Sequence, residues 1–182
     1  MFLAPPGANH PRAAFTLLEL LAVIAIIAAL AGIVIGVGRR ATEAGKVARA
    51  KAELAVLATT LEAYQRNCGD YPQTADAARL LQSLIGRRGP TNAVIATHSL
   101  IETARFTTAE SRDPFTDSSA ILTDPWDQPY RYAYKTQAPW SNSIYVLYSI
   151  GPDAKDSPVL LSGGFVDQVS QENADNIHAN RN

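Results

Sequence analysis

The first residue of this 182-residue chain that could carry chemistry is Glu19, in the stretch Phe15-Thr16-Leu17-Leu18-Glu19. That stretch opens an apolar run that continues to Val37, and Glu19 is the only charged residue within the run. A carboxylate at membrane depth costs about 2.5–3.5 kcal/mol on insertion scales. A charge held at that cost predicts a partner of opposite charge.

A second group of candidate residues is acidic and follows the predicted strands near the C-terminal end. Asp153, Asp156, Asp167 and Asp175 lie in a polar segment. Calcium prefers several hard oxygen ligands from loops, with carboxylates and backbone carbonyls combined. These acids therefore either contribute to a calcium site or serve only to solvate a polar loop.

The chemistry of an enzyme is not evident in the sequence. Its three histidines are scattered, no serine lies in a G-x-S-x-G motif, and no glycine-rich phosphate loop occurs. A formal net charge of -1 gives no strong field for nucleic acid. The single cysteine, Cys68, excludes an intramolecular disulfide. We therefore predict a protein that is not an enzyme and has no nucleic-acid partner.

The segments that position Glu19 are a short leader and a long apolar helix. Residues 1–14 are polar and contain Arg12 but no acid, and 15–38 are long enough to cross a bilayer as a helix. Two alternatives exist, a plain anchor and a secretory signal cut near Ala29-Leu30-Ala31. The apolar run continues past that point, which disfavours the signal. The positive-inside rule alone would leave the C-terminal part in the cytoplasm, because five basic residues follow the run between 39 and 51.

The helix is predicted to continue through residues 39–67. Apolar residues recur there at spacings of three and four, which gives one stripe for packing on a domain: Val47, Ala50, Leu54, Leu57, Leu61 and Tyr64. The charged residues of this segment, Glu53 among them, are expected mostly off the stripe. Asn67, Gly69 and Pro72 end the helix. Thr74 is then expected to cap a second helix, Ala75 to Ile85.

Residues 68–182 are predicted to form an α+β head. Residues 87–123 form a long variable loop with a short helix near Ser99 to Ala104. Tyr130, Tyr132 and Tyr134 alternate with polar or small residues, which predicts a strand. Ile144 to Ile150 would be its partner across a hairpin loop, Pro158 to Leu161 a short third strand, and 151–182 an acidic C-terminal loop.

Several of these segments resemble a known family. The leader followed by Phe-Thr-Leu-Leu-Glu is similar to the N-terminus of type IV pilins and type II secretion pseudopilins, although Ala14 stands where that family usually has Gly. Leu54 to Leu84, Asp124 to Tyr130 and Tyr145 to Asp156 resemble elements of the major pseudopilin of type II secretion. Asp127 takes a position where that family typically has Gly.

The resemblance implies a pilin-like ladle, in which a long N-terminal transmembrane helix packs on a small antiparallel sheet. It implies cutting between Ala14 and Phe15 by a prepilin peptidase, methylation of the new N-terminus, and pairing of Glu19 with the Phe15 amine of a neighbouring copy. It also implies bound Ca²⁺ at the carbonyl of Ile150, Asp153 and Asp175.

The function that follows is a structural one. Copies of the chain would sit in the bacterial inner membrane as single-pass proteins, with the head in the periplasm. They would then assemble with an inner-membrane platform and minor pseudopilins into a pseudopilus that drives protein export. A type IV pilin, and an anchored envelope-binding domain that forms no filament, are the alternatives.

Overall fold

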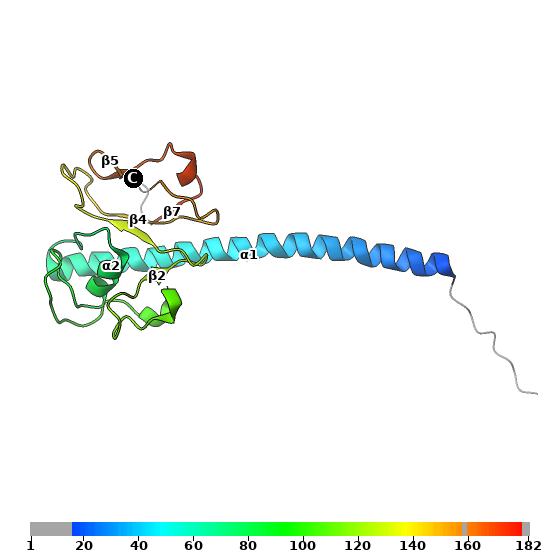
Figure 1. The fold of residues 1–182 in the computed structure, drawn as a ribbon, viewed down its shortest axis with the longest axis horizontal. Coiled ribbons are helices and arrows are strands. Elements are labelled where there is room, and N and C mark those ends of the chain that lie inside the picture. Colours follow the sequence, from blue (N-terminus) through cyan, green and yellow to red (C-terminus); the bar gives the residue numbers. More distant parts are fainter. Residues whose placement is uncertain (1–15, 158–159, 180–182) are drawn as a thin grey trace, which may run out of the picture. The chain divides into compact units, whose positions relative to one another are not determined.

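A computed structural model describes residues 16–157 and 160–179, and of residues 33–39 it describes the backbone alone. The elements along the chain are coloured in sequence order in Figure 1. Two α-helices, three short 3-10 helices and seven strands occur among the described residues: α1 (Leu17–Cys68), α2 (Ala77–Leu84), η1 (Thr103–Arg105), β1 (Thr107–Thr108), η2 (Ala109–Ser111), β2 (Leu122–Thr123), β3 (Arg131–Ala133), β4 (Val146–Ser149), β5 (Leu160–Leu161), β6 (Phe165–Val166), η3 (Gln171–Asn173) and β7 (Ile177–His178). The α+β class predicted from the sequence is confirmed.

The chain divides into two compact units, Met1–Thr42 and Glu43–Asn182. In the first unit, the large apolar side chains of α1 from Leu17 to Leu30 are exposed. Exposed apolar surface on this scale indicates a face that is covered by lipid or by another protein. Within the part of the chain that the structure describes, no helix combines the length and apolar character needed to cross a membrane. The transmembrane assignment of 15–38 therefore stays a prediction.

The second unit is built on the later part of α1. The predicted apolar stripe is confirmed for five of its six residues, since Ala50, Leu54, Leu57, Leu61 and Tyr64 are buried, whereas Val47 is half-buried. Residues three and four apart lie on the same face of a helix, so these side chains form one continuous packing surface. They belong to a core cluster that includes α2 and the tyrosines of β3 and its neighbours.

α1 ends at the predicted stop signals, but the N-cap of α2 is not the predicted residue. α1 ends at Cys68, and Gly69 then adopts a φ of +85°, which a glycine accepts without steric cost. The N-cap of α2 is Asp76, whose side chain accepts a hydrogen bond from the Arg79 backbone N–H. The prediction of Thr74 as the cap was wrong. Its hydroxyl instead accepts a bond from the Asp76 backbone N–H, within the turn before the helix.

The main sheet is antiparallel and has the order β3-β4-β7. Tyr132 on β3 pairs with Leu147 on β4, and both face the core cluster with α1. Ala133, Val146 and Tyr148 lie in a second cluster, which Leu160 and Val166 cover. The sheet is therefore buried on both faces, between the helices and the C-terminal segment.

The third strand of this sheet was predicted incorrectly. β5, at the position of the expected strand, pairs with β6 in a separate hairpin. The strand that joins β4 is β7, with Ser149 opposite Ile177. β7 reaches this position because the intervening residues fold into a lobe, defined here as residues 151–179. The predicted loop 87–123 also contains structure. The 3-10 helix η1 overlaps the end of the short helix predicted near Ser99 to Ala104, and β1 and β2, in the second half of the loop, pair with each other.

Glu53 is the main exception to the predicted stripe. Its side chain is buried, and it accepts hydrogen bonds from the Tyr130 hydroxyl at 2.5 Å and from the Arg49 Nε at 2.7 Å. Arg49 also donates to the Thr107 hydroxyl. Burial and the neighbouring Glu53 carboxylate raise the pKa of Tyr130, so its hydroxyl stays protonated and donates. These hydrogen bonds connect α1 to two segments of the head that are distant in sequence, at Thr107 and at Tyr130.

We expect Tyr130→Phe to lower the free energy of unfolding by about 1–3 kcal/mol, since a buried carboxylate loses a donor. Thermal unfolding of the full chain in detergent measures this change. Tyr134→Phe is the matched control, because the Tyr134 hydroxyl donates to Asp70, a carboxylate that Lys135 also binds nearer the surface. Equal losses in the two variants would contradict the role assigned to the buried Glu53.

Candidate functional site

Glu19 lies in the first turn of α1, where it forms a capping box with Thr16. The Thr16 backbone N–H and hydroxyl both donate to Glu19 Oε2 at 2.9 Å, and the Glu19 backbone N–H donates to the Thr16 hydroxyl at 3.2 Å. This reciprocal arrangement satisfies backbone donors that a helix start leaves unpaired. Ala14 and Phe15, the predicted processing residues, lie outside the described residues.

The capping box is a role of Glu19 that the sequence analysis missed, although the signal was present. A threonine followed three residues later by a glutamate and an apolar run is the usual signature. Within the single chain, Glu19 therefore helps to start the helix. Any partner that binds Glu19 during assembly competes with the Thr16 donors.

The acidic lobe brings together two of the three predicted metal residues. The Asp153 backbone N–H donates to Asp175 Oδ2 at 3.2 Å, across a gap of 22 residues in sequence. Gly151 directly follows Ile150 and has a φ of +74°. A Cβ at Gly151 would come within 2.6 Å of the Asp175 carbonyl oxygen, so only glycine fits here. The predicted ligand segments thus meet at one place.

The oxygen atoms at this place are not fully satisfied. Asp175 Oδ1 and Asn176 Oδ1 are buried and accept no hydrogen bond from the described residues. A buried acceptor without a donor is costly, and a cation is one group that satisfies it. However, no three His, Cys, Asp or Glu side chains converge to hold a metal within residues 16–157 and 160–179. A cation here would need backbone carbonyl ligands as well.

Asp156, another acid of this segment, is engaged elsewhere. Its carboxylate accepts bonds from Arg131 Nε and from the Tyr148 hydroxyl, each at 2.9 Å. Burial and the Asp156 carboxylate raise the pKa of Tyr148, so its hydroxyl remains a donor. Asp156 therefore fixes the start of the lobe on β3 and β4.

Asp124 in the Asp-Pro-Trp stretch forms the centre of a buried polar network. It accepts bonds from the Trp126 and Gln128 backbone N–H groups, each at 2.9 Å, and from the Ser149 hydroxyl at 2.5 Å. The Ser149 oxygen in turn accepts a bond from the Gly151 N–H. This chain of bonds links the Asp-Pro-Trp turn to the loop that meets Asp175.

The same turn also binds α1. The Trp126 indole N–H donates to Glu43 Oε2 at 3.0 Å, and Lys46 lies 6.0 Å from the centre of the Trp126 ring. Asp127 has a φ of +62°, in the left-handed region that favours glycine. This backbone conformation explains why glycine is usual at the corresponding position of the resembling family.

Two family comparisons match different parts of the chain. Residues 9–35 match the prokaryotic N-terminal methylation motif, which defines the class of proteins that carry a methylated N-terminal helix. Residues 38–159, more than half of the chain, match the family described as type II secretion system (T2SS), protein G. The chain belongs to this type II secretion protein G family.

A curated relative supports the same assignment. The type II secretion system core protein G of Pseudomonas aeruginosa is 26% identical over 149 residues, which cover 81% of this chain and 89% of the relative. No solved structure matches the chain significantly. The family and the relative agree with the predicted major pseudopilin rather than with the type IV pilin alternative.

We expect Asp124→Ala to lower the free energy of unfolding by at least about 2 kcal/mol, because the buried Ser149 hydroxyl and two partly buried backbone N–H groups lose their acceptor. The matched control is Asp113→Ala, since Asp113 accepts the Phe115 backbone N–H in a similar turn at the surface. Thermal unfolding of the two variants beside the parent chain provides the comparison. A small loss for Asp124→Ala, similar to that of the control, would contradict a stabilising role for the network.

Proposed function

We propose that this chain, as a pseudopilin of type II secretion, is cut between Ala14 and Phe15 and assembles into a pseudopilus. The observation that carries the proposal is the succession of two matches in one chain. The methylation motif at 9–35 is followed directly by the protein G match at 38–159. A prepilin peptidase, the assembly platform and minor pseudopilins are the partners that this function requires.

The proposed location of the protein rests on the same two matches. The methylation motif and the family support an envelope protein that is anchored by its N-terminal segment. We propose that 15–38 anchor the unassembled protein in the inner membrane and that the head lies in the periplasm. The exposed apolar side chains from Leu17 to Leu30 support a lipid environment before assembly and neighbouring helices after it.

Glu19 is proposed to pair with the methylated amine of Phe15 on a neighbouring copy. Each charge alone is costly in an apolar filament core, and pairing removes much of that cost. Because Glu19 also caps its own helix through Thr16, a variant is needed that keeps the cap and removes only the charge. Gln is suitable because capping boxes use either Glu or Gln at this position.

We expect Glu19→Gln to be processed normally but to lower the yield of sedimentable filaments by at least about tenfold, since the charge pair is lost. Mass spectrometry of the membrane-extracted chain reports processing, as a mature chain that begins at Phe15 with a methylated amine. The matched control is Glu43→Gln, which changes a glutamate farther along the same helix.

Filament formation by Glu19→Gln at the parent level would refute the charge pairing and leave helix capping as the role of Glu19. A chain that keeps Met1 would favour the plain anchor, and a chain that begins near Gly32 would favour a secreted domain. Either mass would refute the proposed processing. That the chain is not an enzyme remains a prediction.

Calcium binding at the lobe is proposed as a second property. Ile150 through its carbonyl, Asp153 and Asp175 would hold the ion, which would neutralise the carboxylates and join the two ends of the lobe. The contact between Asp153 and Asp175, and the unsatisfied Asp175 Oδ1, support this proposal. The exposed Asp153 side chain accepts the Lys155 backbone N–H, so it would have to turn toward the ion.

We expect millimolar calcium to raise the melting temperature of the chain, since a ligand at 100 times its Kd stabilises by about 2.7 kcal/mol. Asp175→Asn should remove this increase, whereas Asp167→Asn, a control in the same lobe, should retain it. Differential scanning calorimetry with calcium and with magnesium makes the measurement. An unchanged melting temperature in calcium would rule out the site.

A further inference from the structure

The surface of the second unit carries an apolar groove bordered by arginines. The groove has a volume of about 560 Å³ and lies between the end of α2 and the following loop, where it is lined by Ile85, Arg87, Arg88, Val94, Ile95 and Phe115. Val94 is 79% exposed and Phe115 is 43% exposed, so both present apolar surface to the outside. A hollow of this kind accommodates a small apolar side chain with acidic neighbours.

Neither bordering arginine forms an ion pair within the described part of the chain. Arg87 donates to the Phe115 carbonyl at 2.5 Å, and Arg88 donates to the Asn92 carbonyl at 3.2 Å. The Ile95 N–H donates to the Arg87 carbonyl, which holds the two walls of the groove together. The guanidinium groups therefore keep donors for an acidic partner.

The lobe carries an exposed apolar side chain with acidic neighbours, which complements the groove. Val169 is 92% exposed, which is the largest exposure among the large apolar residues described. Asp167 precedes it and Glu172 follows it. Residues 151–179 contain five acids and one lysine, whereas residues 77–105 contain four arginines and one acid. The two surfaces are thus complementary in both apolar character and charge.

The segment that presents Val169 is fixed before any contact forms. The Val169 N–H donates to Asp167 Oδ1 at 2.9 Å, and the buried Asn173 donates through its side-chain amide to the Asp167 carbonyl at 2.6 Å. Asn173 Oδ1 also accepts the Ser157 N–H at 3.0 Å. A loop held in this way loses little conformational freedom on binding.

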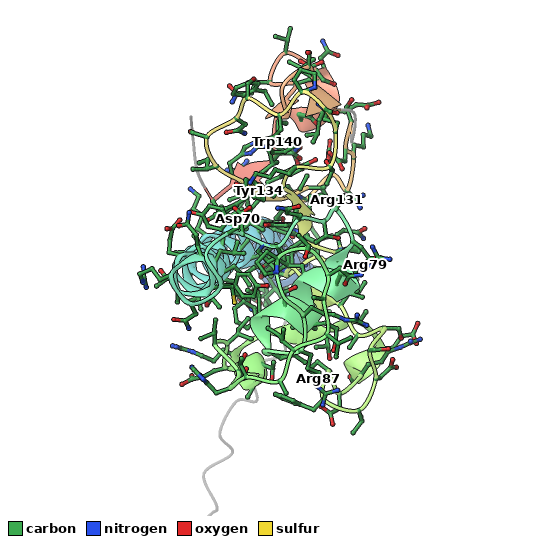
Figure 2. The ribbon with its side chains drawn as sticks, turned by 90° about the vertical axis from the view of Figure 1, so that its left-hand side faces the viewer. Asp70, Arg79, Arg87, Arg131, Tyr134 and Trp140 are labelled. Carbon is green, nitrogen blue, oxygen red and sulfur yellow. The ribbon has the colours of Figure 1, made fainter. Side chains whose placement is uncertain are left out.

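The loop after α2 and the lobe lie on opposite sides of α1 in the second unit. Figure 2 shows Arg87 on one side of α1 and Trp140, with the orange-red lobe around and above it, on the other. Figure 1 shows the same separation between the green loop and the lobe. The lobe of one copy therefore does not reach that copy's own groove, which leaves the groove open to the lobe of a second copy.

We propose that Val169 of one copy inserts into the groove of the next copy, where Arg87 and Arg88 bind Glu172 and Asp167. This contact joins two different surfaces, so it does not close on itself and repeats along a filament. The inference rests on the proposed filament function and names the head surfaces that it uses. The polar part of the contact weakens with salt, as expected for exposed charge pairs.

The test uses the full chain in membranes, in a Cys68→Ala background, with Val94→Cys and Val169→Cys combined. Mild oxidation should give a ladder of dimers, trimers and longer products. A mixture of the two single-cysteine chains should give dimers alone, because each chain then has only one reactive end. The matched control combines Val94→Cys with Leu161→Cys, an exposed residue of β5 in the same lobe, and should give no ladder.

A charge exchange tests the polar contact independently. Arg87→Glu should lower the yield of crosslinked products about tenfold, and adding Glu172→Arg should restore it. Both side chains are exposed, and Arg87→Glu removes one exposed hydrogen bond to the Phe115 carbonyl, so any fall in melting temperature should be small.

The possible results separate the two proposals. Filaments that sediment normally but give no ladder, an equal ladder in the Leu161 control, or crosslinks only to a protein of different mass would overturn the contact alone. Failure of the parent chain to form any filament would overturn both the contact and the proposed function.

Discussion

The packing of one face of α1 against the sheet and α2 is the interaction on which the head depends. Leu54, Leu57 and Leu61 are almost completely buried, and tyrosines from three separate segments close over them. Without this face the strands would have little to pack on, because the longest of them has four residues. A sheet this small requires a helix to cover it.

Two buried carboxylates fix how the other segments of the head align on this apolar face of α1. Glu53 joins α1 to Tyr130, and Asp124 joins the Asp-Pro-Trp turn to Ser149 at the end of β4. Hydrophobic contacts are not directional, whereas a buried carboxylate requires its hydrogen-bond donors in a specific arrangement. The apolar stripe therefore supplies most of the stabilisation, and the two acids select the alignment.

The family assignment and the fold together describe a protein with two differently specialised parts. The N-terminal helix carries a capping box and an exposed apolar surface, and the head carries a groove and an acidic lobe on opposite sides. Both parts present surfaces that a single copy leaves open. Such a division suits a subunit that makes most of its contacts with other copies in a pseudopilus.

Local patterns of residues are enough to predict the features that have a short period or a recognisable motif. The α1 stripe, the β3 and β4 pairing, the end of α1 before Gly69 and the family motif around Glu19 all follow from residues close together in the chain. Long-range packing, by contrast, determines that β7 rather than β5 joins the main sheet, that Glu53 is buried and that Asp175 lies against Gly151. These contacts join segments separated by 22 or more residues, as between Asp153 and Asp175, and no local pattern encodes which distant segments will pack together.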